Sequence, residues 1–453
     1  MQQSNTSYRA ILALALPALI QGLLTTIVFI TDRLILARYS ELALGSMQIS
    51  GPIGWISTTL FGSFAVGMAS YIGRSWGANH RERAARYLGA GLWLSFLMGL
   101  ILAGLGVYFT PELCDVMVSS QTSTPELRSL GMLYLYYLFP STPLQIMSSA
   151  LVCGHQSIGN TKHPMYVTLG AGLVNLTVSV VLVHGLFGCP RLGVEGAAIG
   201  TVCAFSFSFA ANLYPVLTRL YPLSVRRPEV EELKHIARLS LPAFGERGLY
   251  HGAYFVFCAY IGHLGNQAMS VHQGLIALES LGFISAHAFG VASFTLSAQH
   301  IGANDSASAM VAIRRTAHLG VGTLAIFGAI LITFSEELIS VFVQSQSSIG
   351  LGSVCLMVVA YAQPLMALTD IFSGAHRGAG DTKTPMWAAV IGPVCIRLCA
   401  CWYLAFVLEL GLVGIWLGSS LDWLVRTCFM ALLTYRGKWL TLTDVDFERQ
   451  PRT

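Results

Sequence analysis

The chain has 453 residues, of which 54% are hydrophobic and 11% are charged, and its formal net charge is +4. Soluble domains carry about 25% charged residues, so this composition indicates a membrane protein, and the small net charge argues against a nucleic-acid partner. The ten cysteines form no CxxC pair and no Cys/His spacing typical of a metal site. We therefore expect neither a metal centre nor a cofactor.

Twelve stretches are long and apolar enough to cross a bilayer, which takes about 20 residues. Their approximate limits are 9–37, 49–72, 86–109, 128–153, 164–188, 193–218, 237–262, 269–299, 313–334, 350–374, 385–408 and 411–434. No long polar segment interrupts the series, which leaves no room for a soluble catalytic domain. The pattern predicts an all-α polytopic membrane protein.

The distribution of Lys and Arg predicts the orientation of these spans. If the N-terminus is cytoplasmic, 19 of the 26 basic residues fall on the cytoplasmic side, and only Arg38, Arg128 and Arg191 fall on the opposite side. We therefore expect a multi-pass protein of the cell membrane (the inner membrane where there are two), with both termini in the cytoplasm.

An internal repeat divides the chain into two halves. Pro17 and Pro242 are 225 residues apart, and so are the triplets Gly77-Ala78-Asn79 and Gly302-Ala303-Asn304. Shorter offsets pair NTKHPM (160–165) with DTKTPM (381–386), and Gly193, Gly196 and Gly200 with Gly411, Gly414 and Gly418. Six spans in each half give the halves the same orientation, as in a parallel repeat. The expected parts are bundles at 1–220 and 237–435, a cytoplasmic linker at 221–236 and a cytoplasmic tail at 436–453.

Several local signals predict helix ends and bends. The glycines of the two Gly-Ala-Asn triplets are expected to let a helix stop. Thr110-Pro111-Glu112 and Ser335-Glu336-Glu337 have the composition of helix starts. Prolines inside spans 1, 4, 7 and 10 are expected to bend those helices, because proline removes a backbone donor; they are Pro17, Pro143, Pro242 and Pro364.

Taken together, these features resemble the multidrug and toxic compound extrusion (MATE) family over almost the whole length. The resemblance rests on Pro17 with Asp32, the two Gly-Ala-Asn loops, the paired NTKHPM and GAGDTKTPM segments, Asn175, and LGVEGAAIGT (192–201). It implies a secondary active transporter, not an enzyme. Such a protein exports organic cations or amphipathic drugs in exchange for H+ or Na+, by alternating access. The small-molecule substrate and the lipid bilayer are then its partners, and two pseudo-symmetric bundles suffice for a monomer.

Asp32 is the strongest candidate for the coupling site. An ionisable group at mid-membrane costs roughly 2.5–3.5 kcal/mol on insertion scales, and the repeat counterpart of Asp32 is Phe257, so the fold does not require an acid there. Burial favours the neutral form of a carboxyl group, as proton exchange needs. The alternatives are an ion pair with Arg33 or a position at the span end near the outer face. Adjacent helical side chains point about 100° apart, so Asp32 and Arg33 do not face each other.

The resemblance implies partners for this acid on spans 5 and 6. The matching positions are Asn175, Ser179 and Thr201. Asn175 and Ser179 are four residues apart and share a helix face. The alternative for them is polar contact between helices, and for Thr201 it is packing.

The second half holds further acids within spans: Glu246, Glu279 and Asp370. Family members with a glutamate in span 7 have it about one turn further on than Glu246, and family sodium sites use a span-10 acid about one turn earlier than Asp370. A Na+ site at Glu246, Glu279 and Asp370 is therefore a hypothesis. Glu246 could instead pair with Arg247. Asp422 and Arg426 are four apart and predict a helical ion pair, while Asp370 and Glu279 are the candidate partners of the buried Arg397.

A second function remains open from sequence. The same superfamily includes flippases of lipid-linked sugars or precursors, whose cavity should be strongly cationic. Here five acids and four arginines lie within spans. No nucleotide-binding GxxxxGK[ST] segment appears, which argues against an ATP-driven pump.

Overall fold

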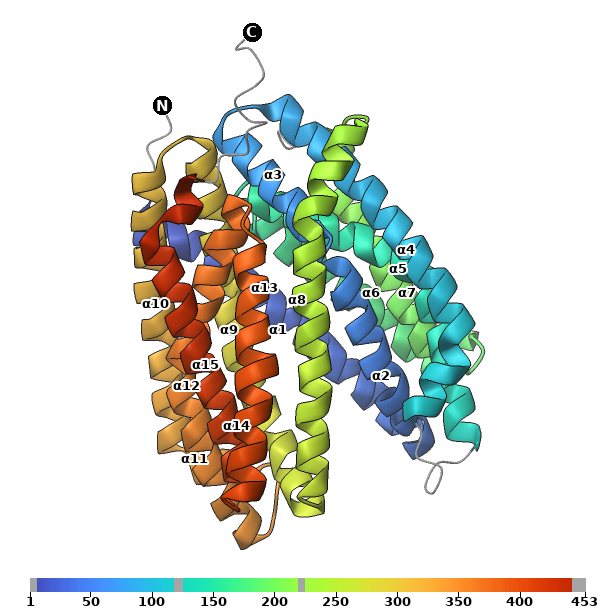
Figure 1. Ribbon diagram of the computed structural model, residues 1–453. Coiled ribbons are helices and arrows are strands. Elements are labelled where there is room, and N and C mark those ends of the chain that lie inside the picture. The colour runs from blue at the N-terminus through green and yellow to red at the C-terminus, as the bar shows by residue number, and fades with distance from the viewer. Residues whose placement is uncertain (1–5, 118–124, 219–224, 442–453) are drawn as a thin grey trace. The chain divides into compact units, whose positions relative to one another are not determined.

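The computed structural model describes residues 6–117, 125–218 and 225–441, and within these ranges the chain forms helices and no strand (Figure 1). The helices are α1 (Tyr8–Tyr39), α2 (Glu41–Gly62), α3 (Ala65–Gly77), α4 (Arg81–Met117), α5 (Pro125–Ser157), α6 (Lys162–His184), η1 (Leu186–Gly188), α7 (Val194–Leu217), α8 (Val230–His263), α9 (Asn266–Gly302), α10 (Ser306–Thr333), α11 (Ser335–Ser340), α12 (Gln346–Ala379), α13 (Lys383–Ala389), η2 (Val390–Arg397), α14 (Leu398–Trp402), η3 (Tyr403–Val407), α15 (Gly411–Arg436) and η4 (Lys438–Thr441).

Each of the twelve predicted spans falls on a helical segment. Nine segments of the described chain are long and apolar enough to cross a membrane: Tyr8–Tyr39, Glu41–Gly77, Arg81–Met117, Lys162–His184, Val194–Leu217, Asn266–Gly302, Ser306–Thr333, Gln346–Ala379 and Lys383–Val407. The other three, α5, α8 and α15, have 33, 34 and 26 residues, which is also long enough. The prediction of an all-α polytopic membrane protein is therefore confirmed.

Two spans are built from more than one helix. The second span breaks after Gly62 and continues as α3. The eleventh span alternates α-helical turns with wider π-helical turns at η2 and η3, and Pro393 lies inside η2. A proline without a backbone N–H is a common cause of such irregular turns.

The signals for helix starts have different outcomes. A short helix, α11, does begin at Ser335, but the start predicted at Thr110-Pro111-Glu112 is wrong, because α4 runs through these residues to Met117. Thr110 instead donates its hydroxyl to the carbonyl of Gly106, 2.6 Å away. The four prolines of the predicted bends all lie inside helices.

The chain folds into two compact units. The C-terminal unit contains Met1–Leu19, Gly73–Asn79 and Leu241–Thr453, and the N-terminal unit contains Ile20–Ile72 and His80–Ser240. The chain therefore passes from one unit to the other within α1, within α3, between α3 and α4 at Asn79–His80, and within α8. The bundle limits 1–220 and 237–435 remain a prediction, and residues 221–224 of the expected linker and 442–453 of the expected tail lie outside the described residues.

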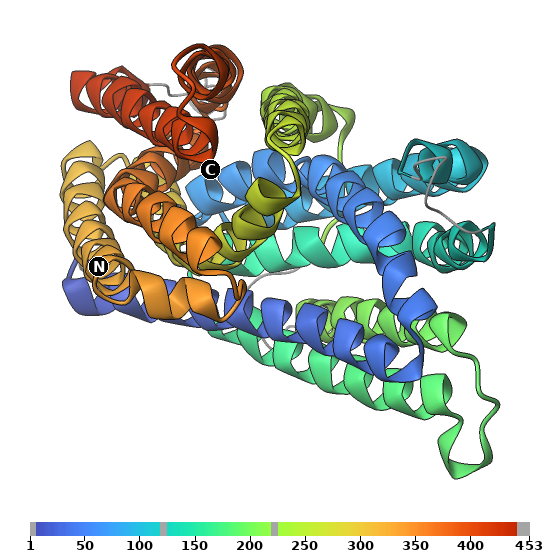
Figure 2. The ribbon, with the colours of Figure 1, turned by 90° about the horizontal axis from the view of Figure 1, so that it is seen from below.

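The core of the C-terminal unit is centred on α9 and α12, which lie side by side (Figure 2). The hydroxyls of Ser293 and Ser297 donate to the carbonyls of Ile371 and Ala375, both at 2.8 Å. The first turns of α1 belong to this core through Ile11, Leu14 and Ala15. In the N-terminal unit, the last turns of α1 contribute Ile35 and Leu36 to a different core.

The repeated glycines let paired helices approach each other in both units. A Cβ atom on Gly196 would lie 2.7 Å from the carbonyl carbon of Leu182, and one on Gly414 would lie 2.6 Å from that of Leu404. Any larger residue would therefore separate α6 from α7, or the eleventh span from α15. The same glycine spacing thus performs the same packing task in each half of the repeat.

The Gly-Ala-Asn triplets form a crossing inside the C-terminal unit. A Cβ on Gly77 would lie 1.9 Å from the carbonyl oxygen of Gln299, and a Cβ on Gly302 would lie 1.9 Å from that of Arg74. Asn79 and Asn304, with φ of 63° and 58°, adopt the left-handed conformation after these helices. Both helices end at these glycines, as predicted. The left-handed turn itself is made by the asparagines two residues later, and the glycines also allow two backbones to touch.

Candidate functional site

The N-terminal unit holds a polar cluster formed by Asp32 of α1, Tyr134 of α5, Asn175 of α6 and Thr201 of α7, here called the Asp32 cluster. The side-chain amide of Asn175 donates to Oδ2 of Asp32 and to Oγ1 of Thr201, in both cases over 3.4 Å. The hydroxyls of Tyr134 and Thr201 are 3.3 Å apart. Four helices therefore converge on one carboxylate and its amide partner.

The cluster leaves buried oxygens without partners. Among the described residues, Oδ1 of Asp32 and Oδ1 of Asn175 accept no hydrogen bond, although Asn175 is only 2% exposed. A buried acceptor without a partner carries a desolvation cost. Protonation would turn the carboxylate into a group that can also donate a hydrogen bond. The arrangement is thus suited to taking up a proton at Asp32.

The predicted partners are only partly brought together. Asn175 and Thr201 bond in the cluster, whereas the fully buried Ser179 has no hydrogen-bond partner in the described structure and lies against Gly200, whose Cβ would be 2.1 Å from its hydroxyl. Tyr134 was not singled out from sequence as a member, because its contact with Thr201 joins residues 67 positions apart.

The ion pair between Asp32 and Arg33 is not formed. The guanidinium of Arg33 lies over the ring of Phe29, with its Cζ 4.0 Å from the ring centroid. No described cation lies within salt-bridge distance of Asp32. The aromatic face stabilises the charge of Arg33 by a cation–π contact. Because its guanidinium lies over Phe29 and not beside the carboxylate, Arg33 does not neutralise Asp32.

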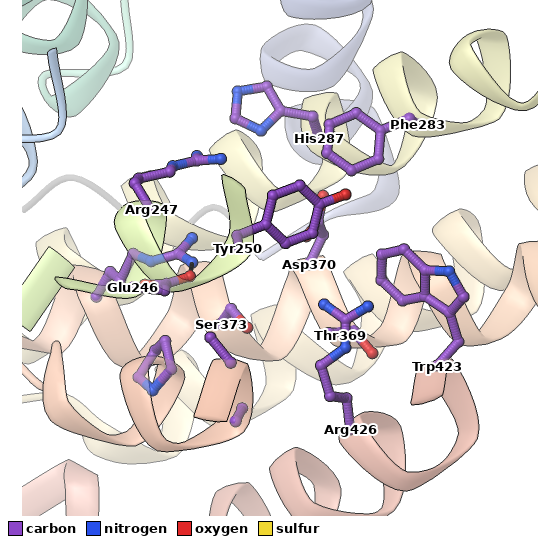
Figure 3. A pocket seen from close by; sticks show the side chains of 14 residues that line it. Glu246, Arg247, Tyr250, Phe283, His287, Thr369, Asp370, Ser373, Trp423 and Arg426 are labelled. Carbon is purple, nitrogen blue, oxygen red and sulfur yellow. Dashed lines mark hydrogen bonds and ion pairs between the residues drawn. The ribbon is translucent and has the colours of Figure 1, made fainter. Parts of the chain in front are cut away.

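The C-terminal unit contains a polar cavity with about 600 Å³ of empty space, part of it open to solvent (Figure 3). Its walls come from α8, α9, α12, α13 and α15. The side chains that line it are mostly charged, aromatic or hydroxylic: Glu246, Arg247, Tyr250, Phe283, His287, Thr369, Asp370, Ser373, Arg377, Pro385, Ala388, Ala389, Trp423 and Arg426.

Glu246 pairs with Arg377 across this cavity. Their ion pair joins α8 to α12, and both side chains are less than one fifth exposed. The sequence offered Arg247 as the partner of Glu246, and that alternative is wrong. Arg377 was missed, because nothing local to either helix shows which residues face each other.

Asp422 holds two arginines. Its oxygens accept bonds from Nε and Nη2 of Arg426 at 2.7 and 2.9 Å, and Nη2 of Arg397 lies 2.7 Å from Oδ2. The predicted pair Asp422–Arg426 is therefore formed. The partner of Arg397 is also Asp422, not Asp370 or Glu279.

The three acids of the sodium hypothesis do not form one site. Glu246 and Asp370 line the cavity, but Glu279 does not, and Glu246 is already paired with Arg377. In the described residues, no three His, Cys, Asp or Glu side chains are grouped so that they could hold a metal ion. We therefore assign no step to a sodium ion bound by these three residues together.

The comparisons with known proteins agree with the repeat. A sequence model of the MatE family matches residues 17–181 and 242–403, so its two matches begin at the paired prolines. A probable multidrug resistance protein NorM of Thermotoga maritima is 27% identical over 439 residues, covering 95% of this chain and 93% of that protein. An FAD transporter of Shewanella oneidensis is 23% identical over 376 residues, 81% of each chain.

Solved structures share the fold at low identity. A MATE protein crystallised in a straight conformation superposes with a TM-score of 0.87 at 18% identity, covering 96% of this chain and 97% of that one. A MOP superfamily transporter from Pyrococcus furiosus superposes with a TM-score of 0.86 at 18% identity, covering 96% of both chains. The likeness in fold thus extends over nearly the full length.

Proposed function

The chain belongs to the MatE family of membrane transporters and is not an enzyme, and from this premise we propose that it is a multidrug efflux antiporter coupled through Asp32. It would export organic cations and amphipathic drugs in exchange for protons, by alternating access. The names of the NorM relatives support the substrate range. The Asp32 cluster supports the choice of proton.

The observation that carries the coupling is the state of the Asp32 carboxylate. It accepts one bond from Asn175, has one oxygen without a partner, and has no described cation beside it. A charged group in that setting is costly unless it is paired. Proton binding removes the charge, so its free energy can be used to change the conformation of α1.

α1 is suited to transmit this change. Its first turns pack in the core of the C-terminal unit and its last turns in a core of the N-terminal unit. Pro17 lies between them and removes one backbone hydrogen bond. We propose that protonation of Asp32 alters the bend of α1 near Pro17 and so displaces bound substrate.

We also propose that the protein lies in the cell membrane with both termini in the cytoplasm, and that it acts as a monomer.

The flippase alternative has less support. A cavity for a lipid-linked pyrophosphate needs several cations without partners, but Arg377 and Arg426 of the observed cavity are paired with Glu246 and Asp422. Drug efflux needs no such cluster.

The decisive experiment uses purified protein in liposomes and measures ethidium transport under separate H+ and Na+ gradients. We expect a pH gradient to drive transport, and Asp32→Asn to abolish that response while folding normally. Glu336→Gln, which neutralises an exposed acid on α11, is the matched control and should transport normally. Full proton-driven transport by Asp32→Asn would refute the proposal. Transport driven by a Na+ gradient alone would show that the coupling ion is not the proton.

A further inference from the structure

A pair of glutamines ties the segment of α1 between Pro17 and Asp32 to a neighbouring helix. Nε2 of Gln156 on α5 donates to Oε1 of Gln21 over 3.2 Å. Within the described chain, no other side chain of this segment bonds to a different helix. Its hydroxyl groups donate to carbonyls of α1 itself, from Thr25, Thr26 and Thr31. The Gln21–Gln156 bond is therefore the polar contact that fastens this part of α1.

The position of this bond along α1 is specific. The helix passes from the C-terminal to the N-terminal unit between Leu19 and Ile20, and Gln21 lies one turn after Pro17, which leaves the helix without one backbone hydrogen bond. The bond to Gln156 is thus formed where α1 joins the N-terminal unit, beside the turn that the proline weakens. A change of bend at the proline moves Gln21 relative to α5, so the bond and the bend depend on each other.

The second half of the repeat has the same contact, made by charged residues. The repeat offset of 225 pairs Gln21 with Glu246, and the offset of 221 pairs Gln156 with Arg377. Glu246 and Arg377 form the ion pair that joins α8 to α12. The fold therefore fastens the first helix of each half at the same place, by a neutral amide pair in one half and by an ion pair in the other.

The two fastenings differ in strength. A hydrogen bond between neutral groups is roughly half as strong as one between charged groups. The two helices also differ further along, because Asp32 of α1 corresponds to Phe257 of α8, which is 2% exposed and packs against the ring of Trp416. Thus α8 combines a strong fastening with an apolar side chain, whereas α1 combines a weak fastening with an acid.

We propose that Gln21 and Gln156 are positioning residues for proton coupling. Their hydrogen bond holds α1 in the form seen here while Asp32 is charged, and it breaks when proton uptake changes the bend near Pro17. The bond thus sets how much of the free energy of proton binding is needed to move α1. The inference rests on the proposed function in one respect, namely that protonation of Asp32 moves α1.

The strength of the bond should set the pH at which transport is half-maximal. Because the bond stabilises the form of α1 in which Asp32 is charged, its loss lets α1 change its bend at a lower proton concentration, and so at a higher pH. One neutral hydrogen bond corresponds to a shift of about 0.5–1 pH unit. An ion pair at the same place should have the opposite effect, because it resists the change more strongly.

The charged and titratable groups around the acid stay the same when the glutamines are changed. They are Arg33 on α1, next to Asp32 in the chain, and Tyr134 of α5 in the Asp32 cluster. The other two helices contribute the uncharged Asn175 and Thr201. A shift in the pH of half-maximal transport therefore reports the position of α1, and not a new neighbour of the carboxylate.

The test measures ethidium export by the full chain in liposomes. The pH is varied on the side from which protons enter and is held constant on the other side. We expect Gln21→Met, which keeps the length of the side chain but lacks the amide oxygen, to raise the pH of half-maximal export by about 0.5–1 unit. Gln21→Glu together with Gln156→Arg copies the ion pair of the second half and should lower it.

The matched control is Gln267→Met on α9 of the C-terminal unit. Its amide also joins two helices, because Nε2 of Gln267 donates to the hydroxyls of Ser347 and Ser348 on α12, both at 3.2 Å. This variant loses the same kind of bond far along the chain from α1, and should leave the pH of half-maximal export unchanged.

A double variant shows whether the two glutamines act through one bond. Gln156→Met should shift the pH of half-maximal export in the same direction as Gln21→Met, and both changes together should shift it no further than Gln156→Met alone. Because the two single variants test the bond from different helices, one of them decides even if the other fails to fold.

Three results would overturn the proposal: an unchanged pH of half-maximal export in Gln21→Met, additive shifts in the double variant, or a rise caused by the charged pair. Asp32→Asn, measured in parallel, separates this outcome from the proposed function. If Asp32→Asn loses the pH response while Gln21→Met behaves as the wild type, only the role of the glutamines fails. If Asp32→Asn keeps the response, the coupling through Asp32 fails as well.

Discussion

Asn175 donates its side-chain amide to the carboxylate of Asp32, from the middle of α6 to the second half of α1. The same amide reaches Thr201 of α7, so one side chain links three helices around the acid. Its own carbonyl oxygen has no partner in the described chain. Asn175 is therefore placed to respond when Asp32 gains or loses a proton.

Removing this amide should impair coupling more than folding. We expect Asn175→Ala to slow proton-driven ethidium export by about tenfold, because the loss of a hydrogen bond to a charged group costs about 1.5–3 kcal/mol. The control is Thr177, on the exposed face of the same helix, whose hydroxyl donates to the carbonyl of Leu173. The Thr177→Ala variant should transport normally. Unchanged export by Asn175→Ala would show that the bond has no part in coupling.

The Asp422 triad should be a strong determinant of stability. Asp422→Asn leaves two buried guanidinium groups without their carboxylate, and we expect a loss of about 3–5 kcal/mol in unfolding free energy. Thermal unfolding in detergent measures this loss. Replacing Asp422, Arg397 and Arg426 together by leucine should recover most of it, since no buried charge then remains. A triple variant as unstable as Asp422→Asn would contradict this account.

Asp381 should give the protein an acid-dependent stability. Burial raises the pKa of Asp381, but hydrogen bonds from His376 and from the hydroxyl and N–H of Thr384 lower it more, so the folded pKa is below the ordinary value. The stabilisation is therefore complete above the unfolded pKa of about 3.9 and is lost as the pH falls through the folded value.

We expect Asp381→Asn to lower the melting temperature at pH 7, and the difference from the wild type to shrink below about pH 4. The effect should be modest, because Asn160, the counterpart in the first half, accepts the same kind of bond, from the N–H of His163 at 3.2 Å. Melting curves from pH 7 to pH 3 test this, and a difference that does not change with pH would disprove the assignment.

The glycine crossing should tolerate no side chain. Gly77→Ala and Gly302→Ala each place a methyl group 1.9 Å from a backbone carbonyl oxygen, which only a backbone shift can relieve. We expect each to cost about 1–3 kcal/mol. Gly322→Ala in α10 has open space around its Cβ and should be neutral or stabilising, since alanine favours helices. Equal stability of Gly77→Ala and Gly322→Ala would mean that the helices do not meet here.

The sequence alone determined the spans, the repeat and the family resemblance, because each depends on hydropathy or on motif order along the chain. It also identified the local pair Asp422–Arg426, since a helix brings residues four apart onto one face. It placed Asp32 among candidate coupling residues, because an acid in an apolar run is conspicuous wherever its partners lie.

Only the tertiary structure decided which distant residues meet. Arg397 could have paired with any acid of the second half, and Glu246 with either of two arginines, because a sequence carries no record of which faces of two helices oppose each other. The roles of Gly77 and Asn79 were likewise separated only by their surroundings: a carbonyl 1.9 Å from a missing Cβ explains the glycine, and a φ of 63° explains the asparagine.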